Sequence, residues 1–158
     1  MAFQILLNFF MAFLWMFFES SFQLNTFLIG YLLGLLIIFI MRRFFPGRFY
    51  LAKVFAIIKL VLIFIRELLL SNIAVLKVVL SPKLSIRPGI FALQTELRSD
   101  WEITLLSHLI TLTPGTLVVK LSEDNKTLYI HAIDIEEVDD AINSIKQSFE
   151  KAIMEVSR

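Results

Sequence analysis

The chain has 158 residues, of which 58% are hydrophobic, and its mean hydropathy is +0.78. An ordinary soluble domain is about 45–50% apolar, so this composition excludes a conventional water-soluble protein over the whole length. A formal net charge of +1 excludes a strongly basic nucleic-acid-binding protein. The absence of cysteine excludes disulfides, thiolate catalysis and cysteine-based zinc or iron–sulfur sites. Charge is segregated, with Lys and Arg predominating in residues 42–98 and Asp and Glu in residues 100–158.

Two apolar segments open the chain, and each is predicted to be a transmembrane helix. Phe3–Phe18 and Thr26–Met41 contain no charged residue. A backbone in hydrocarbon must satisfy its hydrogen bonds within itself, which favours helices. A span needs about 20 residues, so polar uncharged neighbours extend the predicted spans to 3–24 and 25–41. The start lacks the basic residues of a cleaved signal peptide, so we expect the first segment to be retained.

Basic residues set the expected orientation. The loop Glu19–Asn25 contains no Lys or Arg, whereas Arg42, Arg43, Arg48 and Lys53 follow the second segment. By the positive-inside rule that second end is cytoplasmic, and two spans then place both the N-terminus and the C-terminal domain in the cytoplasm.

Gly30 and Gly34 form a Gly-x-x-x-Gly pair in the second segment. Such a pair permits close approach of another helix. Two glycines at this spacing also arise by chance in an apolar stretch, and the sequence leaves both interpretations open.

A third helix is predicted over residues 50–80, after a break at Pro46-Gly47. Lys59, Arg66 and Lys77 fall within about 20° of one another on a helix, beside a broad apolar face. Such a helix either lies in the headgroup plane or spans the bilayer with a tilt. Spanning would conflict with the positive-inside rule, so the interfacial position is favoured. Arg66 and Glu67 are interpreted as a headgroup-facing pair rather than a proton relay.

Residues 81–158 are predicted to form a small cytoplasmic α+β domain, separate from the membrane region 1–80. Proline and glycine breaks, alternating apolar residues and a Ser99/Glu102 capping box give the element order βαββα. The expected elements are a strand Ile90–Leu97, a helix from Ser99 to about Ile110, strands Thr116–Leu121 and Thr127–Ile133 joined by a polar turn, and a helix Glu136–Val156.

No catalytic or metal-binding pattern is found, so we expect neither an enzyme nor a bound metal or cofactor. His108 and His131 are the two histidines, and they form no paired motif. An acidic cluster lacks the glycine and spacing of an EF-hand and is interpreted as negative charge at a helix N-terminus. Its members are Asp134, Glu136, Glu137, Asp139 and Asp140.

The turn between the predicted helix and the second strand carries the strongest candidate site. Thr111, Thr113, Pro114 and Gly115 place hydroxyls around a rigid Pro-Gly corner. The turn either docks or couples to another protein, or simply needs this geometry. A second candidate set consists of charges that would face the membrane surface or a neighbouring protein of a complex, namely Arg42, Arg43, Lys59, Arg66, Glu67 and Lys77.

Three ordered motifs resemble one known family. Ser81–Ile90 resembles its "SP-x-L-x-I-RPGI" segment, Ile110–Leu117 its "ITLTPGTL" segment and Leu128–Asp134 its "LYVHALD" segment. This is the MnhE family, which comprises the E subunits of the multisubunit Mrp-type Na⁺/H⁺ antiporters. The resemblance covers essentially the whole chain. One departure is visible, because His108 and Leu109 stand where the family often has Asn-Ser.

The resemblance implies an accessory, non-catalytic subunit of a hetero-oligomeric complex in the bacterial cell membrane, needed for assembly, stability or full Na⁺/H⁺ exchange. Its partners would be other antiporter subunits and lipid, with the ions Na⁺ and H⁺ moved by the complex and no nucleic acid involved. The residues agree on one point, since neither predicted span holds a charged side chain for an ion relay. The alternatives are a membrane-anchored binding or assembly module with no transport role and, less favoured, a membrane-bound enzyme.

Overall fold

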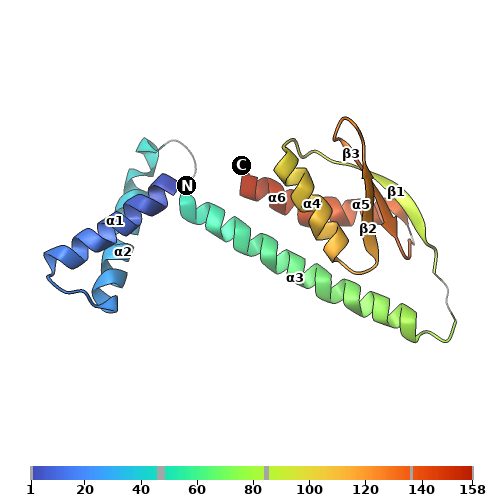
Figure 1. Cartoon of the computed structure of the whole chain (residues 1–158), viewed down its shortest axis with the longest axis horizontal. Helices are drawn as coiled ribbons and strands as arrows, with labels where there is room; N and C mark the ends of the chain where they lie inside the picture. Colours follow the sequence, from blue (N-terminus) through green and yellow to red (C-terminus); the bar gives the residue numbers. More distant parts are fainter. Residues whose placement is uncertain (1, 46–48, 84–85, 136, 158) are drawn as a thin grey trace. The chain divides into compact units, whose positions relative to one another are not determined.

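The computed structural model describes residues 2–45, 49–83, 86–135 and 137–157 (Figure 1). The predicted features at Pro46, Gly47, Arg48 and Glu136, and the Leu84-Ser85 part of one motif, lie outside these residues. The chain forms two compact units, Met1–Phe55 and Ala56–Arg158. The division falls inside the long helix, whereas the sequence places the domain boundary at residues 80/81.

The first unit is a helical hairpin with its polar and small residues inside. Helix α1 spans Ala2–Phe18 and α2 spans Leu24–Ile40, followed by a short 3₁₀ turn η1 at Met41–Phe44. Every fourth residue of each helix is buried, as when the i±4 ridges of two helices interlock. The buried residues are Gln4, Asn8, Ala12 and Met16 in α1 and Thr26, Gly30, Gly34 and Ile38 in α2.

The outside of the hairpin carries large apolar side chains, including Phe3, Phe10, Phe17 and Leu32. Without a hydrophobic driving force between helices, small and polar residues form helix contacts in lipid. Among the described residues, one helical stretch, Leu24–Phe44, has the length and composition of a membrane span, with 21 residues and hydropathy 2.3. Helix α1 is apolar but shorter, at 17 residues.

The first predicted segment, 3–24, is longer than the helix observed. Helix α1 ends at Phe18, and Ser20 adopts a left-handed conformation with φ 50° that turns the chain. Leu24 is the first residue of α2, whereas the first predicted segment includes it.

The two glycines of α2 bring the helices into contact. A Cβ added to Gly30 would lie 2.7 Å from Trp15 Cβ and 2.9 Å from the Ala12 carbonyl oxygen. A Cβ added to Gly34 would lie 2.9 Å from Met11 Cβ and still closer to Asn8 Oδ1. Of the two interpretations of Gly-x-x-x-Gly, close helix packing is therefore the one observed, and the packing partner is α1.

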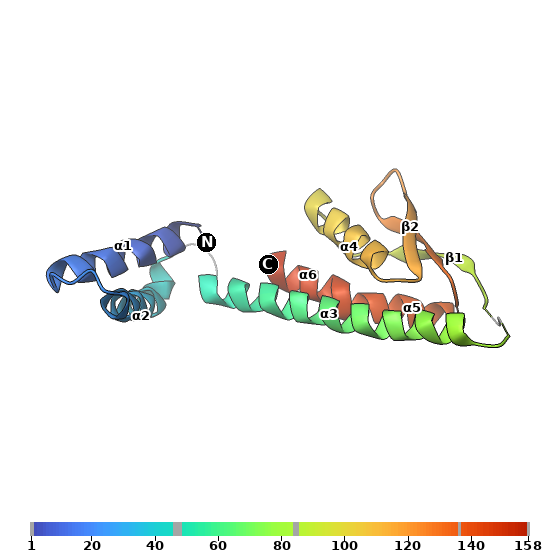
Figure 2. The same cartoon turned by 60° about the horizontal axis from the view of Figure 1, so that its bottom comes forward.

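Helix α3, Tyr50–Leu80, contains 31 residues and is about 46 Å long. Its residues from Ala56 onward belong to the second unit, where Leu60, Ile63 and Phe64 pack against the core of the C-terminal elements. Figure 2 shows α6, Lys151–Ser157, beside α3. The opposite side of α3 exposes aliphatic residues such as Leu62, Ile65 and Leu69.

The rest of the second unit is a three-stranded antiparallel sheet covered by helices on one face. The strands β1 Gly89–Gln94, β2 Thr116–Leu121 and β3 Thr127–Ala132 lie in the order β1-β3-β2. Helix α4, Asp100–Leu112, connects β1 to β2. After β3 come α5, Val138–Ile145, a π-helical turn η2, Lys146–Glu150, and α6. The core is built from residues such as Leu93, Leu106, Leu128, Ile130 and Ile153.

Two predicted boundaries differ from the structure. Strand β1 ends at Gln94 rather than Leu97, because the Glu96 N–H and the Thr95 hydroxyl bind the buried carboxylate of Glu150. The predicted helix 136–156 begins at Val138 among the described residues and contains the π-helical turn.

Glu102 at the start of α4 holds the predicted cap. Its carboxylate accepts the N–H groups of Ser99 and Arg98, both at 3.0 Å. Burial raises the pKa of Glu102, but hydrogen bonds from the Ser157 side chain and from the Ser99 and Arg98 backbones outweigh it and lower the pKa to about 2. The Glu102 carboxylate thus holds the start of α4 and also binds Ser157, the last residue of α6.

Glu102→Gln is expected to lower stability at pH 7 by about 1 kcal/mol, because the substitution removes the charged acceptor of a helix cap. The folded pKa, about 2, lies below the ordinary value of 4.5. The stabilisation is therefore complete above pH 4.5 and is lost as the pH falls toward 2. Unfolding midpoints of the purified wild-type and variant chains should converge over this interval. If the unfolding midpoints of wild type and variant differed equally at pH 7 and at pH 2, the charged Glu102 carboxylate would not be the stabilising group.

Candidate functional site

The Thr-Pro-Gly-Thr turn closes the C-terminal end of α4 with its own hydroxyls. The hydroxyl oxygens of Thr113 and Thr116 lie 2.6 and 2.7 Å from the Ile110 carbonyl oxygen, and 2.9 Å from each other. The last carbonyls of a helix lack intrahelical donors, so these hydroxyls supply what the helix end lacks. Thr113 is buried, and its polar atom is directed into the turn rather than toward solvent.

Gly115 sets the shape of the corner. Its φ of +92° belongs to a region that L side chains rarely adopt. Its carbonyl oxygen accepts the N–H of Ile133 at 2.9 Å, which fastens the turn to the end of β3. A Cβ at this position would lie 3.2 Å from a methyl of Ile133 and 3.3 Å from a methyl of Val75 in α3. The turn therefore touches α3, β3 and α4 at once.

Thr111 differs from the other residues of this candidate site. It is exposed in the last turn of α4, and its hydroxyl oxygen lies 3.4 Å from the backbone N of Val118 in β2. The side chain thus lies over the outer edge of a strand, apart from the compact Thr113–Thr116 corner.

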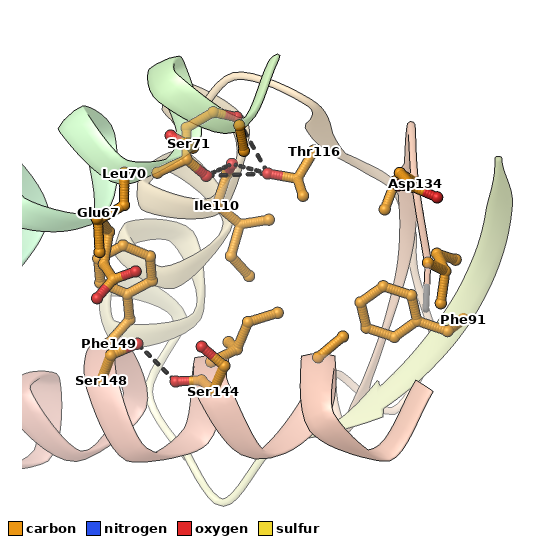
Figure 3. A pocket seen from close by; sticks show the side chains of 16 residues that line it. Glu67, Leu70, Ser71, Phe91, Ile110, Thr116, Asp134, Ser144, Ser148 and Phe149 are labelled. Carbon is orange, nitrogen blue, oxygen red and sulfur yellow. Dashed lines mark hydrogen bonds between the residues drawn. The ribbon is translucent and has the colours of Figure 1, made fainter. Parts of the chain in front are cut away.

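A cavity of about 340 Å³ lies beside the turn, between α3 and the C-terminal elements (Figure 3). This volume is within the range of small-molecule pockets. Figure 3 shows Glu67 of α3 and Asp134, which follows β3, on opposite sides, with Ile110 between them. The remaining walls are mainly apolar and come from Leu70, Ala74, Phe91, Ala132, Ile135, Ala141, Ile145 and Phe149, with hydroxyls of Ser71, Thr113, Thr116, Ser144 and Ser148.

Several polar groups around the cavity have local partners. Ser71 and Ser148 donate to carbonyl oxygens of their own helices, at 3.1 and 2.7 Å. Arg66 Nη1 lies 2.6 Å from the carboxylate of Glu67, and Arg87 Nε lies 3.8 Å from that of Asp134. The cavity is therefore an apolar space where α3 meets the domain, without converging unpaired charges.

The predicted surface charges belong to both units of the chain. Arg42 and Arg43 are exposed in η1, with the Arg42 guanidinium 4.7 Å from the centre of the Phe39 ring. Lys59 of α3 binds the carboxylate of Glu155 in α6, at 2.7 and 2.8 Å. Lys77 is exposed in the last turn of α3. Within the second unit, Lys59, the Arg66–Glu67 pair and Lys77 lie at separate points along α3, and Lys59 is turned toward the domain.

Histidines and acidic residues form no cation site in the part of the chain that the structure describes. No group of three or more His, Asp or Glu side chains that could hold a metal ion occurs among the described residues. His108 Nδ1 lies 2.7 Å from the Thr104 carbonyl oxygen of its own helix, and His131 pairs across the sheet with Ile90 and Leu117.

Reasoning from sequence missed a polar network in the first unit. The Gln4 side-chain oxygen accepts the backbone N–H of Tyr50 at 2.9 Å, and Asn8 Nδ2 donates to the Tyr50 hydroxyl at 2.9 Å. The Tyr31 hydroxyl lies 3.2 Å from the same oxygen. The available signal was the spacing of Gln4 and Asn8, four apart in an otherwise apolar segment, which places both on one helix face.

A second missed residue is Glu150, which is 1% exposed in the π-helical turn. Its carboxylate accepts the Thr95 hydroxyl at 2.7 Å and the N–H of Glu96. Glu150 thereby ties the C-terminal helix to the chain leaving β1. Its place in an amphipathic helix among Glu and Lys residues offered no signal that it would be buried.

Comparison with known proteins identifies the family. The profile of a family described as "Na+/H+ ion antiporter subunit" (MNHE) matches residues 8–156. The chain is 63% identical to the Na⁺/H⁺ antiporter E subunit of Bacillus subtilis and 51% identical to that of Alkalihalophilus pseudofirmus, covering 100% of both chains in each case.

Two solved membrane complexes contain chains of similar structure. One is the Mrp complex from Dietzia sp., with 29% identity, a TM-score of 0.50, and coverage of 62% of this chain and 92% of that chain. The other is the membrane-bound sulfane sulfur reductase, an archaeal respiratory membrane complex, with 26% identity, a TM-score of 0.55 and coverage of 95% and 96%. The resemblance seen in the three motifs is thus confirmed, and the chain belongs to the MnhE family of Na⁺/H⁺ antiporter subunits.

Proposed function

We propose that this chain is a non-catalytic accessory subunit of a multisubunit Mrp-type Na⁺/H⁺ antiporter, required for assembly, stability or full exchange activity. Membership of the MnhE family supports a place in the antiporter complex. The hairpin of α1 and α2, which buries its polar and small residues, supports an accessory role. Helices α1 and α2 contain no charged residue, so they offer no carboxylate or lysine to relay an ion. Their large apolar outer surface instead suits contact with lipid and with other membrane helices.

The proposed placement has α1 and α2 crossing the bacterial cell membrane and the C-terminal α+β domain in the cytoplasm. The exposed Arg42 and Arg43 directly after α2 support a cytoplasmic end there. The exposed aliphatic side of α3, with Leu62, Ile65 and Leu69, supports a helix lying at the membrane surface. Lys59 then serves the domain rather than lipid headgroups, because it binds Glu155.

The Thr-Pro-Gly-Thr turn is proposed to couple α3 to the domain. Gly115 lies against Val75, while Thr113 and Thr116 hold the end of α4. A force applied to α3 at the membrane surface would pass through this corner into the sheet. Thr111 and Pro114 are less buried than Thr113, so they are the residues placed to meet a neighbouring subunit.

The function is tested by deleting the chain from an otherwise complete antiporter in a salt-sensitive host. Na⁺-dependent dissipation of ΔpH is measured in everted vesicles, and native gels give the size of the complex. We expect exchange to be lost. A broken complex would assign the chain to assembly, and an intact one would assign it to exchange itself. Unchanged exchange and unchanged size would refute the proposal and favour a membrane-anchored binding module.

A further inference from the structure

The two edges of the β-sheet differ in how they are protected from other strands. At the β2 edge a bulge interrupts the pairing between Val118 and Lys120, and Lys120 is exposed. The Thr111 hydroxyl lies over the N–H of Val118 at this edge. Bulges, edge lysines and covering side chains are the devices by which proteins prevent unwanted strand pairing.

The β1 edge carries none of these devices among the described residues. Strand β1, with the sequence Gly-Ile-Phe-Ala-Leu-Gln, is regular over its six residues and contains no charge and no proline. It is an outer strand of the sheet (Figure 1). An uncharged edge strand without such devices is a template for pairing with another chain.

The direction of the free backbone groups follows from the register. Thr95 donates its N–H to the carbonyl of Lys126, the residue directly before β3, so the N–H of Thr95 points toward β3. Antiparallel pairs alternate between hydrogen-bonded and non-hydrogen-bonded. The N–H and C=O groups of Ile90, Ala92 and Gln94 therefore point away from β3, and no hydrogen bond to them is present within the described structure.

The side chains beside this edge are also suited to a partner strand. Ile90 is 62% exposed on the uncovered face of the sheet. It lies in a cross-strand row with His131 and Leu117, and Tyr129 stands next to this row. The uncovered face next to the free edge is thus mainly apolar and uncharged.

We infer that the free edge of β1 receives an extended segment of another subunit of the antiporter complex, which adds a fourth strand to the sheet. Each outward residue offers one donor and one acceptor at strand spacing, and an extended backbone is the ligand that matches this pattern. The segment is uncharged and carries an aliphatic side chain beside Ile90. The inference rests on the proposed function, since it takes its partner from the complex.

A second copy of this chain suits the edge less well. Antiparallel self-pairing centred on Ala92 would set Ile90 opposite Gln94 and Pro88 opposite Glu96. The exposed aliphatic group would then face an amide, and the proline would contribute no N–H to the ladder.

Ala92→Pro is the deciding substitution, because it removes an N–H that no intramolecular bond uses. Proline is tolerated on an edge strand where the N–H faces outward. Ala92→Val is the matched control that keeps the N–H. Unfolding midpoints of both purified chains should stay within a few degrees of wild type. The yield of intact complex is expected to fall at least five-fold in Ala92→Pro and to stay unchanged in Ala92→Val. Equal yields in both would overturn the inference.

Hydrogen exchange in the full complex gives the second measurement. The amides of Ile90, Ala92 and Gln94 should exchange at least ten-fold more slowly in the assembled complex than in the purified chain. Equal exchange in both states would overturn strand addition while leaving the accessory role intact. Failure of the wild-type chain to co-purify with antiporter subunits would overturn both proposals. Oxidative cross-linking of Ala92→Cys to itself in native membranes would overturn the inference in favour of a second copy.

Discussion

Gly34→Leu is expected to separate α1 from α2 and to cost about 3 kcal/mol, which would prevent a stable hairpin. A side chain at this position meets Asn8 Oδ1 and Met11 Cβ before it meets any open space. Overpacking a tight interface costs about 1–3 kcal/mol, and here the helix backbones themselves must move apart. The hairpin unfolding midpoint in detergent and the amount of complex on native gels are the measurements.

The control for Gly34→Leu is Leu36→Phe, which enlarges a side chain that is 52% exposed on the outside of α2. This variant should behave like wild type. Gly34→Ala combined with Asn8→Ala should cost less than the sum of the single substitutions, because both act at the same contact. Equal losses in Gly34→Leu and Leu36→Phe would show that α2 does not pack on α1 through its glycines.

Gly115→Val is expected to have an effect of similar size, a loss of about 2–3 kcal/mol in the C-terminal unit. A non-glycine residue in a left-handed conformation costs about 1–2 kcal/mol, and a β-branched one costs more. The new methyls would also press on Ile133 and on Val75 of α3. Thermal unfolding of the purified chain measures the loss, and exchange in everted vesicles should fall with it.

Gly89→Ala is the matched control for Gly115→Val. Gly89 has no left-handed conformation, and its added Cβ would meet only the end of the Ile135 side chain at 3.0 Å. That flexible methyl can shift, so the expected cost is below about 1 kcal/mol. If Gly115→Val unfolded no earlier than Gly89→Ala, the turn would not constrain the fold.

Local patterns made much of the C-terminal unit predictable from sequence. Strand β2 lies at Thr116–Leu121 as expected, because alternating apolar residues follow a Pro-Gly stop. The α4 start followed from Ser99 and Glu102, whose reciprocal spacing signals a helix cap. Both features are set by residues close together in the sequence, so a short stretch of sequence is enough to predict them.

Features that depend on distant residues could not be predicted in the same way. Strand β1 stops early because Glu150, 54 positions away, binds the N–H of Glu96. The sequence left open whether the turn docks to a partner or only needs its geometry, because the orientation of the Thr113 and Thr116 hydroxyls depends on the end of α4. The cavity between α3 and the domain arises from the distance at which two helices pack, a quantity that no motif encodes.

The hydrogen bond between Tyr50 and Gln4 has a consequence for synthesis on the ribosome. The acceptor lies 46 positions before the donor and comes from the first turn of α1. Tyr50 is the first residue of α3, so its backbone N–H lacks an intrahelical acceptor. Because synthesis runs from the N-terminus, the residues of α1 and α2 are all made before the start of α3 can acquire this partner.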